Sequence, residues 1–125
     1  MPGDTLDALV IEALASAPSP LGAYHLADAL RQQGHRPAMM SLYRSLDRLC
    51  AGRRVERVAT LAAFRIRDVP NAALMICVEC GATCSLAVAA ERAALEDAIA
   101  GTGFMIGTLV IEAIGLCPAC GDREE

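Results

Sequence analysis

The strongest constraint on how this chain can fold is a set of four cysteines in two pairs. Each pair has the spacing C-x-x-C, with Cys77 and Cys80 in the first pair and Cys117 and Cys120 in the second, and 36 residues lie between them. Four thiolates brought together form a tetrahedral cage that suits zinc. Two redox motifs or a disulfide pair are the alternatives, but a thioredoxin-type motif normally occurs once, between a strand and a helix. We therefore predict a closed structural zinc site with one ion per subunit.

A glycine follows each cysteine pair. Gly81 comes directly after Cys80, and Gly121 comes directly after Cys120. Because glycine has no side-chain carbon, the chain can turn tightly there and let backbone N–H groups face the sulfurs. We expect both glycines to shape the metal site in this way.

The composition limits the kind of protein to one or two small domains in a reducing compartment. The chain has 125 residues, of which 54% are hydrophobic but only 3% are aromatic, so the core must be mainly aliphatic. No apolar run approaches the roughly 20 residues needed to cross a membrane, and no secretory signal is visible at the N-terminus. The six cysteines then fit a cytoplasmic protein that uses them as metal ligands and free thiols.

The charges are distributed very unevenly along the chain. Residues 31–67 contain nine arginines against two acids, a net charge of +7, whereas the remainder carries −11. A basic segment in an acidic chain indicates a polyanionic partner for that segment alone. A solvated charged surface is the simpler alternative, but the excess of arginine favours phosphate binding.

The N-terminal half has the pattern of three helices. Apolar residues at helical spacing predict helices at 5–17, with Thr5 as its cap, and at 23–33. A third helix is expected at 37–50, with Pro37 in its first turn, where the missing N–H is not needed.

The third helix would have two different faces. Met39, Leu42, Leu46 and Leu49 form an apolar stripe at steps of three and four residues. The other side offers polar, cationic and large side chains that could enter a DNA groove, although ordinary amphipathic surface helices are also common. These side chains are Met40, Ser41, Arg44 and Arg48, with Tyr43 at the edge.

A basic hairpin follows the third helix. Residues 55–58 and 62–66 predict two short strands, joined by a turn at 59–61. Three helices and such a hairpin make a winged helix-turn-helix, in which the third helix enters the major groove. The arginines of the hairpin region would contact phosphates, which sets affinity and register but not sequence choice. They are Arg53, Arg54, Arg57, Arg65 and Arg67.

The C-terminal half has a different composition and predicts a second module. The expected division is a winged-helix domain at 1–67, a hinge at 68–72 and a dimerisation domain at 73–125. Within the last, we expect strands at 74–76 and 85–88, a helix at 89–100 and a strand at 104–114 that Gly107 interrupts. The fold class is thus α+β, with a small α/β domain closed by the four-cysteine zinc site. Because about 55 residues cannot hide such apolar strands alone, we expect a homodimer through this half.

Four segments together resemble the ferric uptake regulator superfamily, and within it most closely the zinc uptake regulator branch. The segments are SLYRSLDRL at 41–49, VERV at 55–58, MICVECG at 75–81 and VIEAIGLCPAC at 110–120. Their order and spacing match over nearly the whole chain, from about residue 21 to residue 120. The resemblance implies a dimeric bacterial transcription factor, usually a repressor, that binds a palindromic AT-rich operator in double-stranded DNA.

The resemblance also implies roles for particular residues. Tyr43 and Arg44 correspond to contacts of the recognition helix, and the four paired cysteines correspond to the structural zinc ligands. Together with the basic segment, this gives a set of expected DNA-binding residues: Ser41, Tyr43, Arg44, Arg48, Arg36, Arg53, Arg54 and Arg57.

The chain departs from the family at the positions of the regulatory metal ligands. By the resemblance, these positions hold Glu56, Arg67, Pro70, Ser85 and Ile114. The two histidines, His25 and His35, both lie in the DNA-binding half; we expect His25 on the surface. A second metal site needs several N, O or S ligands converging on one point, and arginine cannot serve as one. We therefore predict that the usual sensory site is absent.

Two cysteines remain outside the pairs. Cys50 and Cys84 could each be a small apolar residue, as free cysteines often are, or a redox thiol. Cys84 could also be an extra ligand near the zinc.

An enzyme is not expected. No nucleophile–base pair with a third group is evident, and a zinc bound by four cysteines has no open position for substrate. The rival to a DNA-binding regulator is a degenerate family member that forms dimers or binds a partner protein and no longer reads DNA.

Overall fold

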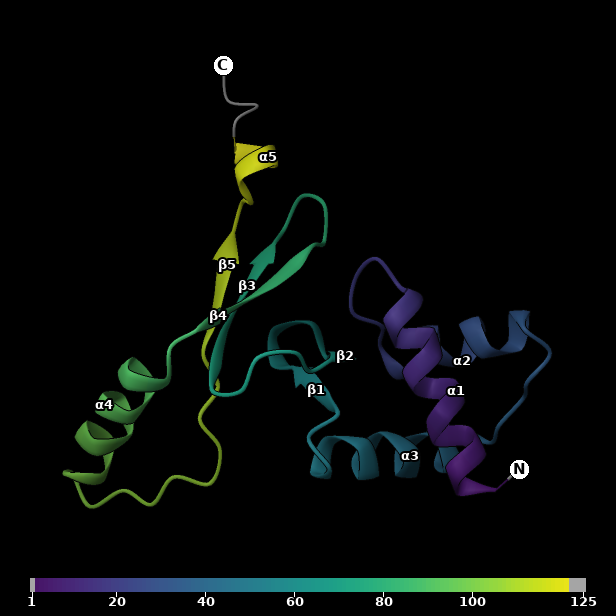
Figure 1. The fold of residues 1–125 in the computed structure, drawn as a ribbon, viewed down its shortest axis with the longest axis horizontal. Helices are drawn as coiled ribbons and strands as arrows, with labels where there is room; N and C mark the ends of the chain where they lie inside the picture. Colours follow the sequence, from purple (N-terminus) through teal and green to yellow (C-terminus); the bar gives the residue numbers. More distant parts are fainter. Residues whose placement is uncertain (1, 122–125) are drawn as a thin grey trace. The chain divides into compact units, whose positions relative to one another are not determined.

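The computed structural model describes residues 2–121 and divides into two compact units. Unit 1 is Met1–Arg67 and unit 2 is Asp68–Glu125. Unit 1 contains three helices and a hairpin, and unit 2 contains a three-stranded sheet with one long helix (Figure 1). None of the described helices is long and apolar enough to cross a membrane.

The three helices of unit 1 form one apolar core. They are α1 (Gly3–Ser16), α2 (Ala23–Gln32) and α3 (Met39–Ala51). Each helix contributes buried leucine, valine or alanine side chains at helical spacing, and Val55 of the hairpin joins them. The predicted stripe on α3 is confirmed, because Leu42, Leu46 and Leu49 are buried and Met39 packs against the core.

The starts of two helices differ from the predictions. Thr5 lies inside α1 rather than at its cap, and the capping residue is Pro2, which makes no side-chain hydrogen bond. Pro37 lies before α3 rather than in its first turn, since Ala38 is the extended residue that precedes the helix. Both errors arise because a cap is defined by backbone conformation, which residue type suggests only weakly.

The predicted hairpin is confirmed. Strands β1 (Val55–Val58) and β2 (Ala63–Ile66) are antiparallel, with Val55 opposite Ile66. A short 3₁₀ turn, η1 (Ala59–Leu61), joins them and ends at Ala62, which adopts the left-handed conformation with φ of 50°.

Unit 2 has the predicted order of two strands, a helix and a strand. Its sheet has the order β4-β3-β5, with β3 antiparallel to β4 and parallel to β5. The elements are β3 (Ala72–Cys77), β4 (Thr83–Ala87), α4 (Ala89–Ala100), β5 (Glu112–Gly115) and the short α5 (Pro118–Gly121). Because β3 begins at Ala72, the sheet starts inside the segment predicted as a hinge at 68–72.

The long strand predicted at 104–114 is wrong for most of its length. Only Glu112–Gly115 pairs with β3, and residues 104–111 form no strand. Arg92 of α4 instead holds part of this segment, because its Nη1 donates to the Leu109 carbonyl at 2.8 Å and its Nη2 to the Ala72 carbonyl at 3.2 Å. The segment has the apolar composition of a strand, but it has no neighbouring strand to pair with, and composition alone does not form a strand.

Candidate metal centre and nucleic-acid interface

The four paired cysteines meet at one end of the sheet in unit 2. Cys77 is the last residue of β3, and Cys117 and Cys120 lie after β5. The parallel pairing of β3 with β5 places Cys77 opposite Gly115, so the two pairs must approach each other. The four sulfur atoms all lie within 4.8 Å of one another, which confirms that the sequence pairs form a single cluster.

The geometry of this cluster fits a zinc ion. The Sγ atoms of Cys80 and Cys117 are 3.9 Å apart, too far for a disulfide. Tetrahedral coordination with Zn–S bonds of about 2.3 Å requires sulfurs roughly 3.8 Å apart. All six cysteines are free thiols in the structure, so the disulfide alternative is not observed.

The pKa values of two of these thiols are shifted in opposite directions. Backbone N–H groups, first that of Cys117 and then that of Cys80, lower the pKa of the Cys77 thiol to about 6. Hydrogen bonding with Cys117 instead raises the pKa of Cys120 to about 12. Crowded thiolates repel one another, so all four ionise together only when a divalent cation compensates their charge.

The two glycines of the cysteine pairs behave differently. Gly81 has φ of +78°, the left-handed conformation that glycine adopts without strain, and its N–H donates to the Cys77 carbonyl. Gly121 ends the short helix α5 and has no positive φ. The tight turn predicted after the first pair is confirmed at Gly81. Gly121 closes its turn without the left-handed conformation, because its N–H donates to the Cys117 carbonyl at 2.8 Å at the end of α5.

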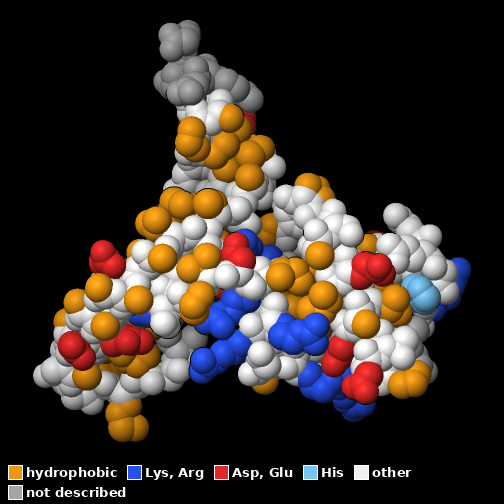
Figure 2. All heavy atoms as spheres, viewed as in Figure 1, with side chains coloured by type: hydrophobic (Ala, Val, Ile, Leu, Met, Phe, Trp, Pro, Cys, Tyr) orange, Lys and Arg blue, Asp and Glu red, His pale blue; other side chains and the backbone are white. Residues whose placement is uncertain are grey.

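The outer face of α3 and the hairpin region carry the expected DNA-binding side chains. Met40 is 62% exposed and Tyr43 is 40% exposed, Arg44 is also exposed, and Ser41 is half-buried. Four further predicted arginines are exposed, namely Arg36, Arg53, Arg54 and Arg57. Figure 2 shows basic side chains gathered over α3 and the β1–β2 hairpin. Unit 1 thus presents a cationic surface beside an exposed helix face.

Arg48 differs from the other candidates because it is bound within the protein. Its Nη2 lies 2.8 Å from Oδ1 of Asp7, and its Nε lies 3.2 Å from Oδ2, so the pair is bidentate. The fully buried Ser45 donates its hydroxyl hydrogen to the same carboxylate. Arg48 therefore joins α3 to α1, and sequence analysis missed Asp7 and Ser45 because the contact is tertiary.

Replacing Asp7 with Ala is expected to destabilise unit 1 by about 1–3 kcal/mol. The change leaves a buried hydroxyl on Ser45 without its acceptor, and a lost charged hydrogen bond is worth about that much. Urea unfolding would measure the effect. The double variant Asp7→Ala, Ser45→Ala is the matched control and should recover part of the loss, since no orphaned hydroxyl remains. Equal stability of wild type and Asp7→Ala would contradict the role given to this carboxylate.

The same contact makes a prediction for acid stability. Hydrogen bonding from Arg48 holds the pKa of Asp7 below its ordinary value, with a further contribution from Ser45. Because the folded pKa lies below the unfolded value of about 3.9, the contribution is complete above that pH. This contribution of Asp7 to the free energy of unfolding is lost as the pH falls through the folded pKa. The free energy of unfolding of Asp7→Ala should therefore depend less steeply on pH in this range than that of the wild type.

The positions matching the family's regulatory metal ligands hold other interactions. Glu56 forms an ion pair with Arg65, its partner residue across the β1–β2 hairpin. Ser85 donates a 2.7 Å hydrogen bond to Asp68. Within residues 2–121, the cysteine cage is the cluster of metal-ligating side chains that the structure brings together. Arg65, expected to contact phosphate, is mostly buried, and its guanidinium is engaged by Glu56.

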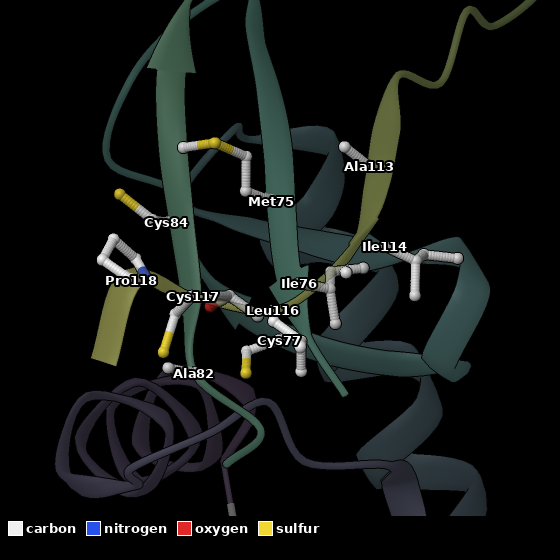
Figure 3. Close-up of a pocket in the computed structure, with 12 residues that line it drawn as sticks. Met75, Ile76, Cys77, Ala82, Cys84, Ala113, Ile114, Leu116, Cys117 and Pro118 are labelled. Atoms are coloured by element: carbon white, nitrogen blue, oxygen red, sulfur yellow. The ribbon is translucent and has the colours of Figure 1, made fainter. Parts of the chain in front are cut away.

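The two remaining thiols lie in different surroundings. Cys50 is half-buried and packs against the core of unit 1, and burial is the main cause that raises its pKa. Cys84 is exposed on β4 and lies outside the four-sulfur cluster. It lines a mainly apolar cavity of about 450 Å³, together with Met75, Ile114 and Pro118 (Figure 3).

These surroundings predict different reactivities for Cys50 and Cys84. In the zinc-bound protein, Cys84 should react first with a disulfide reagent such as DTNB. The thiolate is the nucleophile, and Cys50 is half-buried with a raised pKa, whereas Cys84 is exposed. Cys84→Ser should remove the fast phase, and Cys50→Ser should leave it intact. A fast phase that depends on Cys50 would overturn this assignment.

The fold and the cysteine cluster together define a class of protein. Three helices, a two-stranded wing and a separate sheet with a four-thiolate metal site are the features of a zinc-stabilised winged-helix protein. No family model matches the chain. The zinc uptake regulation proteins of Escherichia coli (strain K12) and Shigella flexneri are each 31% identical over 109 residues, which cover 83% of this chain. The chain spans 64% of the length of these curated relatives.

Solved structures support the same relationship. The crystal structure of holo XcZur superimposes with a TM-score of 0.82 at 27% identity, covering 94% of this chain and 84% of that chain. A zinc uptake regulator complexed with zinc and DNA superimposes with a TM-score of 0.85 at 27% identity, covering 95% and 83%. In both sequence and fold, the chain is therefore similar to the zinc uptake regulators, a branch of the ferric uptake regulator superfamily. These relatives are regulators, in agreement with the prediction that the chain is not an enzyme.

Proposed function

We propose that this protein is a transcriptional regulator that binds palindromic DNA operators as a homodimer in the cytoplasm and acts as a repressor. The observation that carries the proposal is the exposed face of α3 beside the basic hairpin. A net charge of +7 in residues 31–67 suits the phosphate backbone. The related structure that contains zinc and DNA supports the same assignment.

In the proposed complex, α3 lies in the major groove. Arg44, Tyr43 and Ser41 face base edges, where arginine can donate two hydrogen bonds to guanine. Phosphate contacts come from exposed arginines around the helix and hairpin, which are Arg36, Arg53, Arg54 and Arg57. Arg48 helps indirectly, because its ion pair with Asp7 fixes α3 against α1.

The homodimer is supported by how little unit 2 buries by itself. Among the described residues of this unit, the buried ones are Leu74, Ile76 and Cys77, and α4 has no buried residue. Large apolar side chains remain exposed, including Phe104 at 66% and Met105 at 89%. Figure 2 shows hydrophobic side chains gathered on this unit. So much apolar surface is typical of an interface, and a second copy would cover it.

The proposed role of zinc is structural, with one ion in each subunit. The four cysteines that would hold it are Cys77, Cys80, Cys117 and Cys120. A zinc ion there would tie the end of β3 to the segment after β5, and thereby stabilise the small sheet. Four thiolate ligands fill the tetrahedral coordination sphere, so no position is free for a substrate.

We also propose that operator binding needs no second, regulatory metal. Glu56 is engaged by Arg65, and the other positions matching the family's ligands hold Arg67, Pro70, Ser85 and Ile114. The described residues gather no further cluster of metal ligands. The ion pair between Glu56 and Arg65 thus occupies the hairpin position that the resemblance assigns to a metal ligand.

DNA selection from a random library would test the proposed function. The purified zinc-bound protein should enrich a palindromic duplex, and its affinity for that duplex should fall steeply with salt concentration. A shallow salt dependence and no enriched sequence would favour the rival function, a dimerising partner that no longer reads DNA. A reporter gene placed behind the selected duplex would then distinguish repression from activation.

A further inference from the structure

On the exposed face of α3, one large apolar side chain lies directly opposite the buried residues. Leu42, Ser45, Leu46 and Leu49 are the buried residues of the helix. Since successive residues are about 100° apart around a helix, the opposite direction is occupied by Met40 and Arg44 in the first half of the helix. Asp47 and Ala51 continue this exposed face in the second half. Met40 is 62% exposed. Its apolar side chain is not stabilised by water as a charged side chain would be.

Met40 also lies at the end of α3 that matters most for base reading. It is the second residue of the helix, and the N-terminal residues of a recognition helix contact base edges in the major groove. Arg44 follows one turn later on the same face, so the two side chains are neighbours. A polar contact with a base edge is not available to Met40, because its thioether donates no hydrogen bond and accepts only weakly.

The apolar group that the major groove offers is the C5-methyl of thymine. A flexible, polarisable methionine side chain adapts well to such a contact. We infer that Met40 determines sequence specificity by packing on a thymine methyl within one or two base pairs of the base that Arg44 contacts. This inference rests on the proposed DNA-binding function and goes beyond it, since it assigns a base to a residue.

The expected size of the effect is measurable. Burying one methyl group is worth about 0.8 kcal/mol, which corresponds to roughly a fourfold change in affinity. Removing the methyl from the contacted thymine should therefore weaken wild-type binding about fourfold, and removal elsewhere should have little effect.

The test uses the duplex that the wild-type protein selects from a random library. Each thymine is replaced in turn by deoxyuridine, which lacks the C5-methyl but pairs identically, and affinities are compared for wild type, Met40→Ala and Met40→Leu. Wild type should discriminate thymine from deoxyuridine at one position in each half-site. Met40→Ala should lose that discrimination, and Met40→Leu should keep it, because leucine restores an apolar contact.

Two outcomes would overturn the inference. One is a wild-type protein that binds every deoxyuridine duplex as tightly as the parent. The other is Met40→Ala that still discriminates at the same position, which would assign the methyl contact to another residue. Because Met40 is exposed, equal thermal unfolding of the three proteins would show that the fold is intact. Failure of the proposed function looks different, since no duplex would then be selected at all.

Discussion

Replacing Cys77 with Ser should abolish zinc binding and unfold unit 2. Structural zinc sites contribute an apparent ~10–16 kcal/mol at pH 7, comparable to the whole stability of a typical domain at about 5–15 kcal/mol. Cys77 is buried and ends β3, so a missing ligand there also releases the segment after β5. With only Leu74 and Ile76 as other buried residues, the described part of this unit has little core to compensate.

Three measurements on the same variant would check this result. The zinc content should fall from one ion per subunit to none. Sedimentation should show loss of the dimer, and hydrogen exchange should show loss of protection in β3 and β5. Cys84→Ser is the matched control, because Cys84 is a cysteine of the same sheet outside the cluster, and it should retain all three properties. A Cys77→Ser protein that stays dimeric and zinc-bound would contradict the structural role of the site.

Replacing Arg44 with Ala should weaken binding to the selected operator without affecting folding. An arginine that makes two hydrogen bonds to guanine is worth about 1–3 kcal/mol, so the affinity should fall by roughly 5- to 150-fold. Discrimination should also relax at the contacted base pair. Fluorescence anisotropy with wild-type and substituted duplexes would measure both effects.

Two controls separate base reading from general charge and from folding. Arg31→Ala removes an arginine of α2 that pairs with Asp28 at 3.1 Å, and it should change affinity far less than Arg44→Ala. Arg48→Ala should lower the unfolding free energy, because its partner Asp7 loses a bidentate ion pair. If Arg44→Ala bound every duplex as tightly as the wild type does, α3 would not be part of the DNA interface.

The parts of the structure that could be predicted from the sequence are those set by local patterns. The stripe of Leu42, Leu46 and Leu49 predicted the buried face of α3, because a helix repeats every 3.6 residues. The spacing of the cysteines predicted their cluster, since four thiols at such positions have few other uses. The β1–β2 hairpin followed from two short strands joined by a turn.

The parts that could not be predicted depend on contacts between distant residues. Arg48 looked like a DNA contact, but Asp7 lies 41 residues before it in the sequence and binds it in the fold. Residues 104–111 looked like a strand, yet a strand forms only where a neighbour pairs with it, and pairing with β3 begins at Glu112. Thr5 looked like a helix cap, although α1 begins before it.

The most direct test of a purely structural zinc is whether added zinc changes the affinity of the protein for its operator. The dimer, loaded with one zinc per subunit, would be titrated onto the selected duplex with and without excess zinc, while bound metal is counted in parallel. We expect one zinc per subunit and the same dissociation constant in both conditions. Allosteric effectors typically change affinity by about 5- to 150-fold, so a second tightly bound zinc that tightens operator binding by such a factor would contradict this expectation.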